Sequence, residues 1–211
     1  MKILAVQSRM GIGDTVIFLP FIKALSKKFN SPISILVKEN SKANQYLHQT
    51  KYIDKILTLE RDNKTNNRHG GFFGIFKLAN DLKKYKFDKI FIFNSSLRFN
   101  LVAKISGIPQ IYQYPLFAKN KQHIIEAPKK FLKENLNLDI NEDPEVQIDN
   151  DSISKAAQKF QIDKNTTNIL LGIGGSGPTK RIPAKTFLSV IDKISNIKDC
   201  RFFLATGKAT E

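Results

Sequence analysis

Short segments rich in β-branched and aromatic residues alternate with longer segments of helical periodicity along most of this chain. Some of the short segments, such as Ile90-Phe91-Ile92-Phe93, are apolar throughout, which is typical of strands covered on both faces. Strands that alternate with helices predict a parallel sheet with helices packed on it. An antiparallel sandwich would instead show polar and apolar residues in alternation. We therefore predict an α/β fold with a doubly wound sheet.

The first part of the chain contains five predicted strands, at residues 2–7, 33–38, 55–59, 89–94 and 110–114. Candidate helices lie between them, at residues 15–29, 41–48, 74–86 and 96–106. This order of elements predicts a Rossmann-like domain over residues 1–140.

A polar, acidic segment follows, and we interpret residues 141–167 as an interdomain connection with one helix at 152–160. The alternation then resumes with a strand at 168–173, a glycine-rich loop, a helix at 184–195 and a strand at 201–205. Pro183 suits the first position of that helix. So few elements bury too little surface for an independent domain. We expect residues 168–211 to be the incomplete start of a second Rossmann-like domain, and the chain to be truncated at its C-terminus.

The net positive charge of the chain does not by itself indicate a nucleic-acid partner. Lys and Arg number 34 against 19 acidic residues, a net charge of +15. A nucleic-acid surface needs clustered cations, whereas these are spread over every segment, so no nucleic-acid partner is expected. Peripheral contact with an anionic membrane is a secondary expectation, because a well-placed cation contributes about 1 kcal/mol near such a surface.

Location and redox chemistry are also constrained by composition. No apolar run approaches the roughly 18 residues of a membrane-spanning helix. The apolar run near the N-terminus, Ile3 to Val6, is too short for the core of a signal peptide. We expect a cytoplasmic protein. Cys200 is the one cysteine, so no intrachain disulfide forms, and its neighbours supply no partner for a thiol nucleophile or a zinc site.

The first candidate site is the loop between the first strand and the first helix, which contains Gly11, Gly13 and Asp14. In open α/β sheets, ligands bind outside the carboxyl ends of the strands. The two glycines allow a ligand to approach the backbone closely. Two roles are open to Asp14: an N-cap that accepts from the amides of the first helical turn, or a general base at the edge of a cleft.

The second candidate site is the loop at residues 172–181. Its glycines match a G-x-G-x-x-G spacing, but Pro178 interrupts the motif and the next strand lacks the terminal acid of a dinucleotide site. The position of Lys180 does not fit a phosphate-binding P-loop either. Free amides, hydroxyls and cations at a strand-to-helix turn suit a diphosphate, and a turn with solvated charges explains the same residues equally well. The polar side chains concerned are Ser176, Thr179, Lys180 and Arg181.

Two further motifs are interpreted as structural. Asp149-Asn150-Asp151 has the D-x-D form of metal-dependent glycosyltransferases, but its position before Ser152 indicates turn and helix-start chemistry. His69-Gly70-Gly71 is similar to a lipase oxyanion loop, yet the chain contains no G-x-S-x-G motif to supply a nucleophile. No metal site is expected.

Several short motifs occur together in an order shared with one enzyme family. In that order the chain resembles the ADP-heptose:lipopolysaccharide heptosyltransferases over nearly its whole length. Ile182 stands where the family usually has Trp. The motifs are Gly11-Ile12-Gly13-Asp14, Leu19-Pro20, Ser95-Ser96-Leu97-Arg98, Ser106-Gly107, His123 before an amphipathic helix, and Pro178-Thr179-Lys180-Arg181-Ile182-Pro183.

The resemblance implies a GT-B glycosyltransferase, in which two Rossmann-like domains face each other across a cleft. It implies transfer of heptose or a related sugar, with inversion and without a metal cofactor, from a nucleotide-diphosphate donor such as ADP-heptose to the lipopolysaccharide inner core. The location implied is the cytoplasm or the inner face of the inner membrane. The 211-residue chain alone is expected to be inactive.

The resemblance also assigns roles to residues. Asp14 is implied as the catalytic base. The donor-binding residues implied are Gly13, Ser176, Thr179, Lys180 and Arg181, and the acceptor-binding residues are Arg61 and Arg98. The alternative, from a different class, is a dinucleotide-binding oxidoreductase or a non-catalytic nucleotide-binding module that uses the glycine loop 172–177.

Overall fold

The computed structural model describes residues 1–8, 11–61, 67–116, 123–174 and 181–206. The chain divides into two compact units, Met1–Ile148 and Asp149–Glu211. The division falls inside the segment 141–167 that the sequence predicts as a connection.

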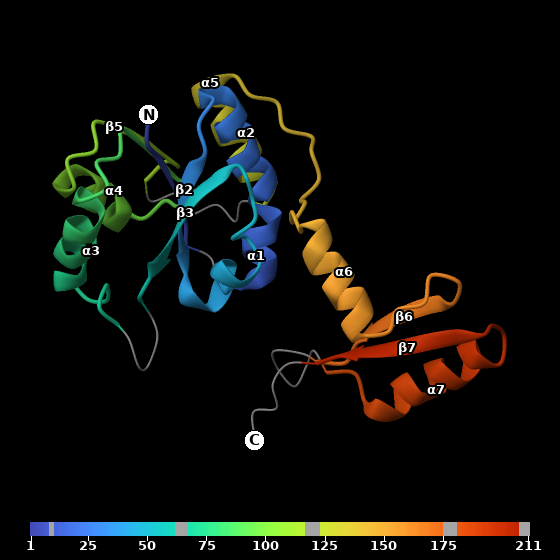
Figure 1. Cartoon of the computed structure of the whole chain (residues 1–211). Coiled ribbons are helices and arrows are strands. Elements are labelled where there is room, and N and C mark those ends of the chain that lie inside the picture. The colour runs from blue at the N-terminus through green and yellow to red at the C-terminus, as the bar shows by residue number, and fades with distance from the viewer. Residues whose placement is uncertain (9–10, 62–66, 117–122, 175–180, 207–211) are drawn as a thin grey trace. The chain divides into compact units, whose positions relative to one another are not determined.

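The first unit is built on a parallel sheet of five strands in the order β3-β2-β1-β4-β5 (Figure 1). Every neighbouring pair in this sheet runs parallel, so the α/β prediction is confirmed. The strands are β1 (Ile3–Gln7), β2 (Ile33–Lys38), β3 (Ile53–Leu59), β4 (Lys89–Ile92) and β5 (Gln110–Gln113).

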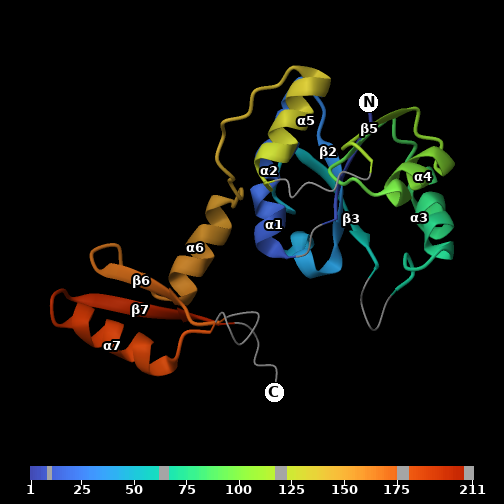
Figure 2. The same ribbon diagram turned by 180° about the vertical axis from the view of Figure 1, so that it is seen from behind.

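Helices cover both faces of this sheet, as the two opposite views show (Figures 1 and 2). Ile3 and Ala5 of β1 pack into one apolar cluster, with α2 and α5, while Leu4 and Val6 pack into the other, with α3 and α4. Alternate side chains of a strand point to opposite faces, so the residues of β1 from Ile3 to Val6 must all be apolar. The helices are α1 (Ile12–Ile17), α2 (Leu19–Phe29), α3 (Phe73–Lys83), α4 (Leu97–Ile105) and α5 (Glu126–Leu136).

Aromatic rings dominate the core beneath α2 and α5. Phe91 of β4 is fully buried, and its ring stacks on that of Tyr112 with centroids 4.6 Å apart. The ring of Phe91 also meets those of Phe29 at 5.8 Å and Phe131 at 6.5 Å. These contacts join two strands and two helices, so Phe91 stabilises the whole face.

Two predicted helices of the first unit differ from the structure. The helix predicted at 41–48 is wrong: the chain forms two short 3₁₀ turns there, η1 (Glu39–Ser41) and η2 (Ala43–Gln45), separated by Lys42 in the left-handed region with φ of 50°. The helix predicted at 15–29 begins earlier, at Ile12, and is broken at Phe18. Pro20 explains the break, because a proline cannot donate to the preceding helical turn and its ring crowds that turn.

The last segment of the first unit is held by polar contacts. Glu142 pairs with Lys23 at 2.8 Å and also with Lys27, and the hydrogen bonds from the two lysines lower its pKa. The amide side chain of Gln147 accepts from the backbone N–H of Lys51 at 2.9 Å. The chain therefore stays attached to the first unit up to the end of that unit.

The second unit contains α6 (Asn150–Lys159), β6 (Thr167–Gly172), α7 (Ala184–Ser195) and β7 (Cys200–Ala205), with β6 and β7 parallel. This is the predicted strand, helix, strand order. Asp149 is the N-cap of α6 and accepts from the backbone N–H of Ser152 at 2.6 Å, which confirms the helix-start interpretation of the D-x-D motif. Among the described helices of both units, none is long and apolar enough to cross a membrane.

We expect Phe91→Ala to lower the free energy of unfolding of the first unit by about 3 to 5 kcal/mol, because the cavity it leaves lies among packed rings. Urea unfolding measures the change. Phe76→Ala is the matched control, since this phenylalanine is exposed on α3, and its effect should stay within about 0.5 kcal/mol. Equal losses in the two variants would contradict the assignment of Phe91 to the core.

Candidate functional site

The candidate site lies where the connections of the sheet diverge. From β1 the chain passes to helices on one face of the sheet, whereas from β4, the adjacent strand, it passes to α4 on the other face (Figure 1). In doubly wound sheets this reversal leaves a crevice outside the carboxyl ends of the two central strands, where ligands bind. The segments that follow Gln7 and Ile92 therefore form the walls of the candidate site.

The β1–α1 turn depends on one glycine. Gly11 is the N-cap of α1 and has φ of 108°, a conformation that residues with a side chain rarely adopt. Its carbonyl oxygen accepts from the backbone N–H of Thr15 at 3.4 Å and from the Thr15 hydroxyl at 3.2 Å. Gly13 lies inside α1, and a Cβ there would meet no atom within 4 Å. Its surroundings leave open space where a ligand could approach.

Asp14 lies in the first turn of α1 and is half-buried. Its carboxylate lies close to Gly11, 3.7 Å from where a Cβ on that glycine would stand. The buried side chain of Gln7 donates from Nε2 to the carbonyl oxygen of Asp14 at 3.1 Å, which fixes the helical turn to the end of β1.

The capping role considered for Asp14 is wrong. The helix begins three residues earlier than that role requires, with Gly11 as N-cap and no side-chain hydrogen bond at the cap. Asp14 is instead the third residue of α1. The second role, that of a general base at the edge of a cleft, stays a prediction.

Uncharged polar side chains join the ends of three strands beside this turn. Asn94, just after β4, donates from Nδ2 to the Ser8 hydroxyl at 2.7 Å, and its Oδ1 accepts from the backbone N–H of Ser96 at 2.6 Å. Gln113 of β5 donates from Nε2 to the carbonyl oxygens of Asn94 and Ser96, each at 2.9 Å. Asn100 completes the network by donating to Gln113 at 2.9 Å. These hydrogen bonds join the described segments at the carboxyl ends of β1, β4 and β5.

A hollow of about 410 Å³ opens at the carboxyl end of β2. It is lined by η1 and η2 and by Ile56 and Thr58 of β3. Because η1 packs on α1, this hollow adjoins the helix that bears Asp14. It offers space at the same edge of the sheet.

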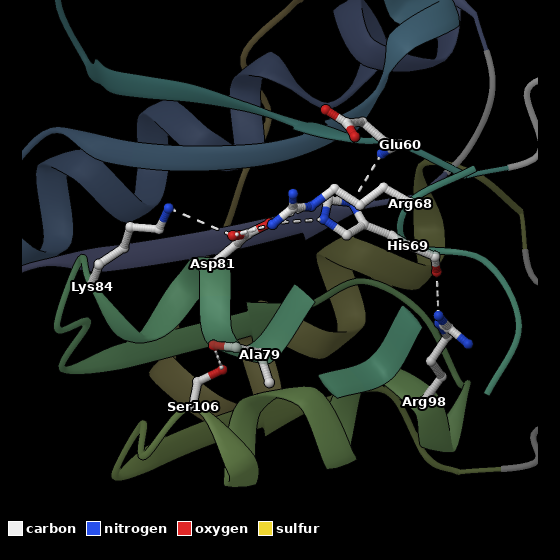
Figure 3. A network of polar contacts seen from close by, with 8 residues as sticks. All are labelled: Glu60, Arg68, His69, Ala79, Asp81, Lys84, Arg98 and Ser106. Carbon is white, nitrogen blue, oxygen red and sulfur yellow. Dashed lines mark hydrogen bonds and ion pairs between the residues drawn. The ribbon is translucent and has the colours of Figure 1, made fainter. Parts of the chain in front are cut away.

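The connection between β3 and α3 is held by a buried histidine (Figure 3). His69 Nδ1 accepts from the backbone N–H of Glu60 at 3.1 Å, so the ring proton lies on Nε2, which donates to Asp81 at 3.1 Å. The guanidinium of Arg68 also donates to both oxygens of Asp81, at 2.8 and 3.1 Å. These bonds give the segment 67–71 a structural role, in agreement with the rejection of a lipase-type loop.

The charge of Asp81 is set by these partners. Burial by itself would raise the pKa of its carboxyl, but hydrogen bonds from His69 and Arg68 and the charges of Arg68 and Lys84 outweigh burial. The pKa therefore lies below its usual value of 3.8. Asp81 remains ionised at neutral pH and holds the segment to α3.

Arg98 acts on the same segment from the other side (Figure 3). Its guanidinium donates to the carbonyl oxygen of Gly71 at 2.7 Å and also to that of His69. A Cβ at Gly74 would collide with the backbone of His69 and with the Arg98 guanidinium. The structure thus gives Arg98 a positioning role, in addition to the acceptor contact predicted for it.

The remaining predicted residues fall in three places. Arg61 is half-buried just after β3, at the same edge of the sheet as Asp14. Arg181 is exposed, three residues before α7. Ser176, Thr179 and Lys180 lie outside the described residues, so their donor-binding roles stay predictions.

Sequence analysis missed the polar network at the strand ends. A signal for Asn94 and Gln113 is visible in hindsight. Asn94 is the first polar residue after the apolar residues of β4, and Gln113 is the last residue of β5. No three His, Cys, Asp or Glu side chains of the described segments gather in a way that would hold a metal ion.

Similar folds occur among solved structures. A family 9 glycosyl transferase from Veillonella parvula DSM 2008 matches with a TM-score of 0.70 at 18% identity, over 99% of this chain and 70% of that one. An E. coli ADP-heptose lipopolysaccharide heptosyltransferase II matches at 0.66 and 17% identity, over 97% and 64%. The E. coli heptosyltransferase WaaC with ADP-2-deoxy-2-fluoro heptose matches at 0.61 and 13% identity, over 98% and 69%.

These likenesses confirm the fold class, an α/β chain of the GT-B type. The chain spans 64–70% of the lengths of these three neighbours. No protein-family model and no curated protein sequence matches it.

We expect Asp81→Asn to lower the free energy of unfolding of the first unit by about 1 to 2 kcal/mol at pH 7, because hydrogen bonds to a charged group are lost. Since folding lowers this pKa, the stabilisation is present above the unfolded pKa near 3.9 and is lost as pH falls through the folded value. The difference between the wild type and the variant should therefore shrink as the pH falls through the folded pKa of Asp81, which lies below 3.8. Asp139→Asn is the control: its carboxylate is exposed and pairs with Lys133, so little change is expected. A difference that does not shrink as the pH is lowered below 3.8 would contradict the role of the Asp81 charge.

Proposed function

We propose that this chain forms the acceptor side, and the start of the donor side, of an inverting glycosyltransferase. The observation that carries the proposal is a carboxylate, Asp14, in the first turn after β1, beside the crevice of a GT-B-type sheet. Solved structures with a similar fold include a family 9 glycosyl transferase, an ADP-heptose lipopolysaccharide heptosyltransferase II and the heptosyltransferase WaaC. The proposed substrate pair is a heptose or related sugar on a nucleoside diphosphate and the inner core of lipopolysaccharide. The proposed site of action is the cytoplasmic face of the inner membrane.

In the proposed reaction, Asp14 removes the proton from an acceptor hydroxyl as that oxygen attacks the anomeric carbon of the donor. The bond from the anomeric carbon to the diphosphate breaks in the same displacement, which inverts the configuration. The diphosphate leaves with the electron pair of that bond.

The leaving diphosphate is assigned to the loop 172–181. Its backbone amides, the Ser176 hydroxyl and the Lys180 ammonium would stabilise the negative charge that develops, in place of a metal ion. Thr179, Arg181 and Gly13 are secondary donor contacts in this proposal.

Acidic groups of the acceptor are assigned to Arg61 and Arg98. Arg61 follows β3 at the carboxyl edge of the sheet. Arg98 would act in part through the segment 69–71, whose carbonyl oxygens it binds.

The competing proposal is a dinucleotide-binding oxidoreductase or a non-catalytic nucleotide-binding module. Its only support is the spacing of the glycines at 172–177. Calorimetric titration of the full-length gene product with ADP and with NADH separates the two. Binding of ADP with no response to NADH supports the transferase, and the reverse supports the alternative.

We expect Asp14→Asn to lower the rate of sugar transfer by roughly two to four orders of magnitude, because an amide cannot accept the proton. The change should cost at most about 1 kcal/mol of stability, the size of a helix-dipole contact. Transfer by the full-length gene product and calorimetric binding of the donor are the measurements. Donor affinity should stay near the wild-type value.

Asp151→Asn is the matched control, because Asp151 is also an acid in a first helical turn, that of α6. It should leave transfer unchanged. Near-normal transfer by Asp14→Asn would rule out the proposed base.

We expect Lys180→Ala to weaken donor binding roughly 10- to 100-fold, since a charge-assisted contact to the diphosphate is lost. Lys185→Ala, an exposed lysine of α7, is the control and should bind the donor normally. A chelator should not change the transfer rate. Loss of activity with EDTA and recovery with manganese would instead implicate Asp149 and Asp151.

A further inference from the structure

The N-terminal turn of α3 exposes three phenylalanines. Phe72 and Phe73 are 70% and 75% exposed, and Phe76 is 49% exposed. The ring of Phe72 meets those of Phe73 and Phe76 edge-on, with centroids 5.9 and 5.7 Å apart. Single exposed apolar residues are ordinary, whereas a cluster of large exposed rings marks an interaction surface.

The neighbouring helix α4 exposes a second apolar row. Leu97, Leu101 and Ile105 are all exposed and lie four residues apart, so they share one side of the helix. The two helices lie side by side on one face of the sheet (Figures 1 and 2). The Ser106 hydroxyl, just after α4, donates to the carbonyl oxygen of Ala79 in α3 at 3.2 Å. We call these six residues of α3 and α4 the apolar face: Phe72, Phe73, Phe76, Leu97, Leu101 and Ile105.

The charges on these helices are almost all positive. Lys77, Lys83 and Lys104 are exposed on α3 and α4, as is Lys84 just after α3. Asp81 is the one acid within the two helices; it forms ion pairs with Arg68 and Lys84 and accepts a hydrogen bond from His69. The sequence then contains no acid from Lys89 to Ile125.

We propose that the apolar face docks on an anionic lipid bilayer. Large apolar side chains bordered by lysines are the combination that binds the interface of such a bilayer, because the rings enter the acyl boundary while the cations meet the headgroups. A second copy of the chain is a poor occupant, since two faces bordered by lysines would repel each other. The proposal does not depend on sugar transfer and could hold if that function failed.

The backbone that presents the rings is already fixed. Arg98 binds the carbonyl oxygens of His69 and Gly71, directly before Phe72. The rings of Phe72 and Phe73 therefore need little ordering when they meet a surface, which favours binding.

A tryptophan reporter tests the proposal directly, because the chain contains no tryptophan. Phe73→Trp in the 211-residue chain should shift its fluorescence to shorter wavelength when vesicles containing phosphatidylglycerol are added. Ile197→Trp is the control, since Ile197 is 86% exposed in the second unit, and its emission should not move. No shift in Phe73→Trp, or an equal shift in both variants, would overturn the proposal.

Vesicle co-sedimentation measures how much the phenylalanine rings and the lysines each contribute to vesicle binding. The triple variant Phe72→Ser, Phe73→Ser, Phe76→Ser should bind phosphatidylglycerol vesicles at least ten-fold more weakly. Lys77→Gln and Lys104→Gln should each weaken binding about five-fold, and binding of the wild type to pure phosphatidylcholine should be weak. Lys28→Gln on α2, which packs on the opposite face of the sheet, should affect binding less than either. Circular dichroism checks that each variant folds.

Two results of the sedimentation experiment would overturn the proposal. One is equal loss with Lys28→Gln, which would indicate general charge attraction rather than docking. The other is a concentration-dependent dimer that the triple variant dissociates while vesicle binding is absent, which would assign the apolar face to a second copy.

Discussion

The burial of β1 on both faces is the constraint from which the rest of the first unit follows. None of its five residues is more than 3% exposed, and its backbone is paired with β2 on one side and β4 on the other. The chain can leave this strand only at its ends, and after Gln7 it must turn into α1 within four residues. Gly11, with φ of 108°, makes that turn possible. The packing of the sheet therefore places Asp14 at the edge of the crevice before any ligand is considered.

Much of this architecture could be predicted from the sequence, because apolar runs buried on both faces are hard to mistake. The strands and the helices α3, α4 and α7 were predicted close to their observed bounds. The helix predicted at 41–48 was wrong, because its periodicity could not reveal the left-handed residue Lys42 between two short turns. Pro20 did carry a visible signal for the break between α1 and α2, which the prediction of one helix at 15–29 overlooked.

The candidate site was less predictable than the fold. The glycines and Asp14 were found because they follow the first strand closely. The capping role considered for Asp14 was wrong, because the N-cap of the helix is Gly11, three residues earlier. Ser8 and Asn94 follow β1 and β4, and Gln113 ends β5. No spacing in the sequence indicates that their side chains meet. Only the register of the parallel sheet brings them to one edge.

Arg98 shows how the parts of the first unit are coupled. Its backbone N–H donates to the Ser96 hydroxyl, which belongs to the polar network at the strand ends, while its guanidinium binds the segment that leads to Phe72. The same α4 terminus therefore supports both the wall of the crevice and the start of the apolar face. On the other side of that segment, His69 must keep its proton on Nε2, because Nδ1 accepts from Glu60. The described part of this segment is thus held from both sides, by Arg98 on one and by His69 on the other, and it links the polar network to the start of the apolar face.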